Sequence, residues 1–185
     1  MKPQLAVVVR EARPSDLAAV AAAFLACWRT SYAGFLPADV IDMYDDDSAR
    51  ALWHPTLCNP PAGAIVFVAE RTGRDVLGDV LGVLRIGPDP DEPTAGHVFS
   101  LYVRPDTQGL GVGTRLLAAA DDLFRRDDVH EATLWVFAAN ATALGFYSRM
   151  GWHADGAQRV EPEYGEPELR LRRTLRDGPG DGGAA

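Results

Sequence analysis

The sequence predicts an α/β domain with one central sheet, mostly antiparallel, flanked by helices. Short runs rich in Val and other β-formers are mixed along the chain with longer segments of helical periodicity. Two strand-like runs, 64–70 and 76–86, are separated only by turn-forming residues 72–75, as expected for antiparallel strands. The 185 residues, 47% of them hydrophobic, suffice for one full-sized core. We expect a single domain over residues 1–176 and a disordered, Gly-rich tail over residues 177–185.

The N-terminal part of the chain predicts one strand followed by two or three helices. Residues 5–10 are rich in Val and form the first strand. A helix starts at Pro14, with Ser15 or Asp16 placed to cap its free N–H groups, and continues to about residue 29. Residues 31–37 break the pattern, and one or two shorter helices follow to about residue 53.

The rest of the chain predicts further strands and two helices. Three prolines in residues 87–94 predict a surface loop, and a strand ending at Val103 follows. The helix after the next glycine-rich turn has one apolar stripe, formed by Leu116, Leu117, Ala120, Leu123 and Phe124. The remaining elements are a strand over 132–137, a helix over 140–150 closed by Gly151, and strands over 152–160 and 168–175.

Composition and charge exclude several classes of protein. The formal net charge of -8 argues against a general nucleic-acid binder and fits an amine-bearing substrate. No apolar run approaches the roughly 20 residues of a membrane-spanning helix, and the N-terminus lacks the features of a signal peptide. The two cysteines, Cys27 and Cys58, have no metal-ligand spacing. We therefore expect a cytoplasmic protein with no metal, nucleic-acid or membrane partner.

The most informative motif is the glycine-rich turn from Gln108 to Thr114, which lies between a strand pattern and a helix pattern. Its glycines, at 109, 111 and 113, permit a sharp turn whose N–H groups converge on a guest at the start of a helix, where anions are favoured. The spacing differs from a Rossmann fingerprint, which needs Gly at position 114, and from a Walker A loop, which needs a Lys. A phosphate cradle and a plain tight turn both remain open on this motif alone.

A second motif runs from Asn140 to Trp152. Asn140 is placed to cap its helix, and Tyr147, seven residues later, lies two turns along the same face. That face can present an amide and a phenol to one ligand. The alternative is that Asn140 is only a cap and Tyr147 only a half-buried aromatic residue.

Together, the two motifs resemble the GNAT superfamily of N-acetyltransferases, which bind acetyl-CoA. The pattern Q-x-x-G-x-G after Leu-Tyr-Val-Arg-Pro and the pattern N-x-x-A-x-x-F-Y-x-x-x-G-F/W are both present, in this order and with a strand between them. The resemblance extends over residues 7–175, with its specificity in residues 97–152. It implies that the fourth and fifth strands are parallel neighbours that splay apart into a V-shaped slot for acetyl-CoA.

The resemblance also implies roles for individual residues. The strand residues before the turn would bond the pantetheine amides, the turn would hold the pyrophosphate, and two residues of the second motif would lie near the thioester. These cofactor-binding residues are, in order, Leu101, Tyr102, Val103, Gln108, Gly109, Leu110, Gly111, Val112, Gly113, Thr114, Asn140 and Tyr147.

Two of these expectations concern catalysis. Tyr147 would face the CoA sulfur, and a phenol with a pKa near 10 can donate a proton to the departing thiolate. GNAT relatives often carry a glutamate at the start of the strand before the glycine turn, and His97 stands there in this chain. His97 is the predicted general base, with Glu70 or a chain of water molecules as the alternatives.

The acceptor is expected to be a small-molecule amine. Trp28 and Tyr32 are four residues apart and would share a helix face that walls the substrate pocket, although core packing explains them equally well. The predicted function is transfer of the acetyl group of acetyl-CoA to a primary amine. The alternatives are acetylation of a protein or peptide amine, and a non-catalytic acetyl-CoA-binding regulatory module. A homodimer is possible by analogy with the family.

Overall fold

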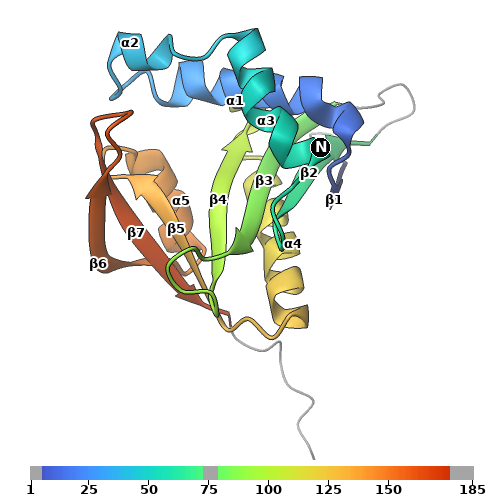
Figure 1. Cartoon of the computed structure of the whole chain (residues 1–185), viewed down its shortest axis with the longest axis vertical. Coiled ribbons are helices and arrows are strands. Elements are labelled where there is room, and N and C mark those ends of the chain that lie inside the picture. The colour runs from blue at the N-terminus through green and yellow to red at the C-terminus, as the bar shows by residue number, and fades with distance from the viewer. Residues whose placement is uncertain (1–5, 73–78, 176–185) are drawn as a thin grey trace, which may run out of the picture.

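A seven-stranded sheet forms the centre of the molecule. The computed structural model describes residues 6–72 and 79–175. In these residues the strand order is β1-β2-β3-β4-β5-β7-β6, and only the β4–β5 pair is parallel (Figure 1). The predicted fold class is therefore confirmed. The strands are β1 Val7–Glu11, β2 Ile65–Arg71, β3 Val80–Pro88, β4 Gly96–Val103, β5 Glu131–Phe137, β6 His153–Val160 and β7 Pro167–Thr174.

Helices cover both faces of this sheet (Figure 1). The apolar stripe of α4 packs behind β1 to β4, where Leu116, Leu117 and Ala120 are almost fully buried. On the other face, α1 and α3 pack over the upper ends of β3 and β4 and bury Val20, Phe24 and several aromatic rings. The helices are α1 Leu17–Ser31, α2 Ala38–Ile41, α3 Asp46–Cys58, α4 Val112–Arg126 and α5 Ala141–Arg149, with short 3-10 turns at Pro14–Asp16 and Pro105–Thr107.

Local sequence signals explain where the helices begin. Asp45 caps α3, because its carboxylate accepts the N–H of Ser48 at 2.8 Å while the Ser48 hydroxyl accepts the N–H of Asp45. Asn140 caps α5, as the sequence predicts. Asp16 lies at the start of α1, but its carboxylate accepts from the N–H of Arg13 and from the Arg10 guanidinium instead of capping that helix.

The β4–β5 pair opens into a V. The two strands are in register only at Gly96↔Ala132, His97↔Thr133 and Val98↔Leu134, although β4 continues to Val103 and β5 to Phe137. Close to this divergence, the pairing of β4 with β3 shifts by one residue, so that Phe99 is left without a partner as a bulge. The splay between the fourth and fifth strands is therefore confirmed.

The loop predicted on the surface at residues 87–94 is partly buried. It begins within β3 and carries a buried carboxylate, because Asp89 is only 3% exposed. The loop crosses in front of β4 and β5 (Figure 1), and it is tied to β7 by ion pairs of Glu92 with Arg170 and Arg172. The predicted turn at 73–75 and the predicted tail at 177–185 lie outside the described residues.

Candidate active site

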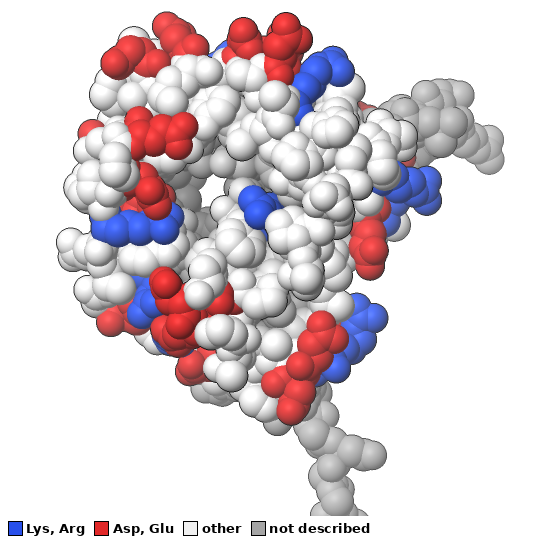
Figure 2. All heavy atoms as spheres, viewed as in Figure 1, with Lys and Arg blue, Asp and Glu red and all other residues white. Residues whose placement is uncertain are grey.

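A cavity of about 1010 Å³ fills the V between β4 and β5. Figure 2 shows the hollow at the centre of this face, with acidic side chains along part of its rim. Its walls come from α1, β4, the glycine-rich turn, β5, α5 and the β6–β7 hairpin. Of the predicted cofactor-binding residues, all except Leu110 line it, and Trp28 and Tyr32 line it too.

The free edge of β4 provides backbone hydrogen-bonding groups inside the V. Arg104 donates its N–H to the Leu81 carbonyl of β3, so alternation along the strand turns the polar groups of Leu101 and Val103 away from β3. At this point β5 has diverged from β4, so β5 does not pair with the polar groups of Leu101 and Val103. The Val103 carbonyl accepts from the Cys27 thiol at 2.8 Å and from Gln108 Nε2 at 3.1 Å. An extended guest can therefore add to this edge as a further strand.

The glycine-rich turn presents an uncapped helix N-terminus to the same cavity. Gly109 and Gly111 have φ of 76° and 82°, a conformation that glycine adopts without strain. A Cβ built on either residue would meet no atom within 4 Å, because the space in front of the turn is open. No side chain caps α4, whose first N–H groups are therefore available to an anion. The turn thus fits a pyrophosphate. The Leu110 side chain is 56% exposed and does not line the cavity, so any contact of this residue with the donor would come from its backbone.

The helix α5 forms the opposite wall. Asn140 Oδ1 accepts the N–H of Ala143 at 3.0 Å, so the cap uses the oxygen and leaves the amide nitrogen available. Tyr147 lies on the cavity wall and is only 8% exposed. Burial raises the pKa of its phenol above the ordinary value, which keeps the hydroxyl protonated at neutral and mildly alkaline pH.

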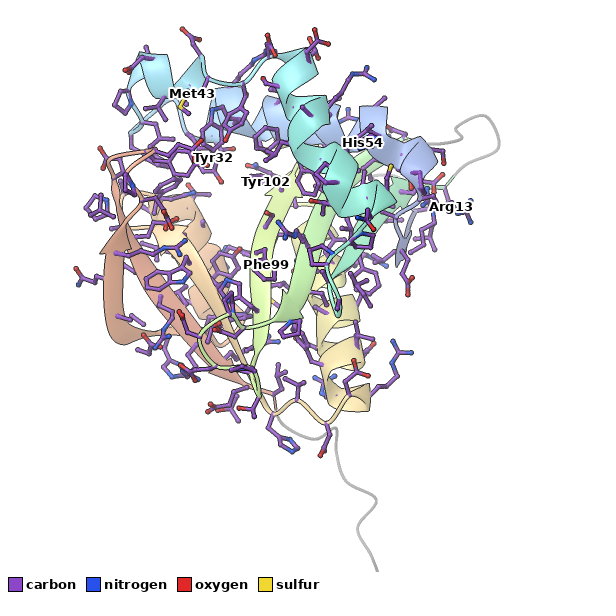
Figure 3. The ribbon with its side chains drawn as sticks, in the orientation of Figure 1. Arg13, Tyr32, Met43, His54, Phe99 and Tyr102 are labelled. Atoms are coloured by element: carbon purple, nitrogen blue, oxygen red, sulfur yellow. The ribbon has the colours of Figure 1, made fainter. Side chains whose placement is uncertain are left out.

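The upper end of the cavity is aromatic and acidic. Figure 3 shows Tyr32 and Tyr102 at this end of the splay, beneath the helices α1 to α3. Trp28 and Tyr32 meet edge to face with their ring centroids 4.9 Å apart. Nothing in the sequence pattern indicated the other wall residues here, because they come from separate segments: Tyr44, Phe137, Arg159, Glu161, Glu163, Tyr164 and Glu168.

The prediction of His97 as general base requires correction. His97 does not line the cavity and is 6% exposed, at the closed end of the V, where the Phe99 ring packs against it with centroids 4.7 Å apart. Its Nδ1 lies 2.6 Å from the Thr133 hydroxyl, which also bonds to Asp89. The imidazole is therefore one end of a buried chain of hydrogen bonds, and it does not face the cavity. Glu70 does not line the cavity either, and it pairs with Arg10 on β1.

This buried chain predicts an acid-sensitive stability. Burial lowers the pKa of His97, although Asp89 partly opposes the shift. A lowered folded-state pKa means that His97 takes up its proton mainly on unfolding, so stability is lost as pH falls below about 6.5. We expect His97→Gln to remove this component, which has a slope of at most about 1.4 kcal/mol per pH unit.

Urea unfolding at a series of pH values measures this effect. His153→Gln is the matched control, because His153 is exposed on β6 and its replacement should leave the wild-type pH dependence in place. An unchanged pH dependence in His97→Gln would show that the buried imidazole does not titrate on unfolding.

Comparison with known proteins identifies the class. Residues 21–152 match the model of the Acetyltransferase (GNAT) family. A probable N-acetyltransferase of Mycobacterium tuberculosis is 31% identical over 160 residues, which cover 84% of each chain. The chain therefore belongs to the GNAT family, and it is an N-acetyltransferase whose co-substrate is acetyl-CoA.

A further relative is an acetyltransferase, and two solved structures share the fold. An L-methionine sulfoximine/L-methionine sulfone acetyltransferase of Pseudomonas aeruginosa is 30% identical over 132 residues, covering 63% of this chain and 74% of that protein. The PaiA N-acetyltransferase of Thermoplasma acidophilum, solved with coenzyme A, shares the fold with a TM-score of 0.70 and 15% identity, covering 92% and 99% of the two chains. YncA, a putative acetyltransferase of Salmonella typhimurium solved with acetyl-CoA, shares the fold with a TM-score of 0.65 and 21% identity. The match covers 95% of this chain and 97% of that one.

Two features are absent from the described residues. No group of three or more His, Cys, Asp or Glu side chains is arranged to hold a metal ion. In the same part of the chain, no helix is both long and apolar enough to cross a membrane.

Proposed function

We propose that this enzyme transfers the acetyl group of acetyl-CoA to the primary amine of a small molecule. The observation that carries the proposal is the continuity of one cavity. It begins at the uncapped N-terminus of α4, passes along the free edge of β4, and ends in the aromatic and acidic chamber beneath α1. A donor held at the first two places would direct its thioester toward the third.

Each end of the cavity suits a different part of the reaction. The β4 edge and the glycine-rich turn hold and orient the donor, and positioning two reactants side by side can lower a barrier by several kcal/mol. Tyr147 donates its phenolic proton to the departing thiolate. Glu161, Glu163 and Glu168 outnumber the one basic residue among them, Arg159, and their negative charge favours an incoming ammonium group.

Loss of the amine proton does not require a histidine in contact with the substrate. The cavity is open to solvent on the face shown in Figure 2, so water can carry the proton away. The carboxylate of Glu163, which lines the same end, provides a further acceptor. The acid limb of the pH profile should then follow the titration of the acceptor amine.

A roof over the acceptor end favours a small molecule over a peptide. Tyr44, between α2 and α3, places its hydroxyl 3.3 Å from that of Tyr164 in the β6–β7 turn. Glu163 lies 3.5 Å from the same Tyr44 hydroxyl, and the Trp28 and Tyr164 rings are 5.5 Å apart. These contacts join the two halves of the molecule above the chamber. The relative named for L-methionine sulfoximine and L-methionine sulfone also supports a small acceptor.

A release assay for the CoA thiol tests this function. We expect steady-state turnover with at least one small primary amine from a mixed panel, and much less with short peptides that present a free N-terminus or lysine. Acetyl-CoA at a hundredfold excess over its dissociation constant should also stabilise the fold by about 2.7 kcal/mol, whereas NAD and ATP serve as non-binding controls. Preferred turnover of peptides would contradict the small-molecule proposal, and acetyl-CoA binding without any turnover would indicate a regulatory module.

A further inference from the structure

Arg85 on β3 is a half-buried cation without a counter-ion. Its Nε is buried and has no hydrogen-bond partner, and its guanidinium makes no ion pair with any described residue. Its guanidinium packs on the Phe99 ring, whose centroid lies 4.6 Å from the central guanidinium carbon. Arg159, which lines the cavity, differs from it because it is paired with Glu161 and Glu168.

The sheet register places Arg85 beside the cavity. Arg85 is directly opposite Ser100 in the antiparallel β3–β4 pair, so the two side chains are on the same face of the sheet with their Cβ atoms about 5 Å apart. Ser100 and Phe99 both line the cavity, and Arg85, which is not itself part of the wall, packs on the Phe99 ring at its edge. Figure 3 shows Phe99 on the open part of β4, below the helices that cover the upper end of the sheet. The guanidinium is therefore within reach of a ligand at the splay.

A half-buried guanidinium with no carboxylate has lost part of its hydration, and the Phe99 ring compensates for only part of that loss. Removing a charge from water costs free energy that only an opposite charge or good hydrogen bonds recover. Burial accordingly lowers the pKa of Arg85 from its ordinary value, with no opposing contribution from any neighbour. The planar fork of an arginine matches a carboxylate with two parallel hydrogen bonds.

We propose that Arg85 binds the carboxylate of the acceptor, so that the acceptor is an amino acid. This inference rests on the proposed function and refines it. The carboxylate lies against Arg85 at the Phe99 bulge, and the amine, one carbon away, lies at the entrance of the aromatic and acidic chamber, where the thioester arrives. The side chain of the amino acid then extends toward the aromatic chamber under Tyr32 and Tyr44.

Matched pairs of acceptors test the proposal. The panel contains the proteinogenic L-amino acids and their α-carboxamides, assayed at one fixed pH with saturating acetyl-CoA. For the best pair we expect kcat/KM to favour the amino acid by about 10- to 100-fold, the range for hydrogen bonds between charged groups. The carboxamide has the less basic amine and so more of the reactive neutral form, which makes the comparison conservative.

Variants of Arg85 assign the preference to this side chain. Arg85→Met keeps an unbranched apolar stem and removes the charge, and it should reduce the ratio between the two acceptors to near one. Arg50→Met removes one positive charge from the exposed face of α3 and should retain the wild-type ratio. If Arg85→Met does not fold, Arg85→Lys tests the assignment in its place. Loss of the planar guanidinium should lower the ratio of kcat/KM between the amino acid and its carboxamide. A wild-type ratio of one or less for every pair, or a ratio that survives loss of the guanidinium, overturns the inference.

Binding separates this inference from the proposed function. If acetyl-CoA binds but no amine of any kind is acetylated, the proposed function is wrong, and calorimetry with CoA-saturated protein then tests Arg85 by itself. We expect an L-amino acid to bind more tightly than its carboxamide, and this difference to disappear in Arg85→Met. Equal binding of both members of every pair would overturn the assignment.

Discussion

Replacing Tyr147 by phenylalanine should slow acetyl transfer by a factor of about 10² to 10⁴, the usual contribution of a positioned general acid. The ring keeps its contacts with Phe146 and Trp152, so packing in the core is retained. Because burial raises the pKa of the phenol, the wild-type hydroxyl remains protonated across the working pH range. Steady-state and single-turnover rates of CoA release measure the effect.

Affinity for acetyl-CoA is the control for this variant. Calorimetry should give nearly the same dissociation constant for Tyr147→Phe as for the wild type, together with a similar melting temperature. A loss of affinity at full turnover would instead assign Tyr147 to donor binding. If Tyr147→Phe had wild-type affinity for acetyl-CoA and wild-type turnover, the hydroxyl of Tyr147 would have no part in the mechanism.

Gly111→Val should abolish acetyl-CoA binding in a protein that still folds. Gly111 has a φ of 82° at the start of α4, and the space in front of it is open where the pyrophosphate would lie. A valine would fill that space and would also resist the left-handed conformation. Loss of two or more charge-assisted N–H bonds corresponds to a fall in affinity of more than about 100-fold.

Replacement of a second glycine separates the effect of backbone strain from that of a blocked binding site. Gly156 on β6 has a φ of 95°, and a Cβ there would also meet nothing within 4 Å, but it does not line the cavity. Gly156→Val should therefore show the cost of the backbone conformation in its melting temperature while binding acetyl-CoA normally. Wild-type affinity in Gly111→Val would mean that the glycine-rich turn has only a structural role.

The sequence alone predicted the fold, which the structure confirms, and the residues of the proposed donor side. This was possible because both motifs are local: Gln108 to Thr114 forms one continuous turn, and Asn140 and Tyr147 lie on one short helix. Backbone conformation and helical periodicity act over a few residues, so spacing along the chain is enough to indicate them. The resemblance to GNAT enzymes added the splay between the strands, and the register of β4 with β5 confirmed it.

Only the tertiary structure brings together the residues of the proposed acceptor side. Tyr44 and Glu168 line one cavity and Arg85 lies opposite Ser100 of its wall, but the three come from separate elements that no periodicity in the sequence relates. The same reason explains the error for His97. Its position at the start of a strand suggested an accessible base, whereas burial against Asp89, Thr133 and Phe99 depends on a loop and a parallel neighbour that meet only in the folded sheet. Local conformation follows from nearby residues, but burial and charge pairing depend on which distant segments the sheet brings together.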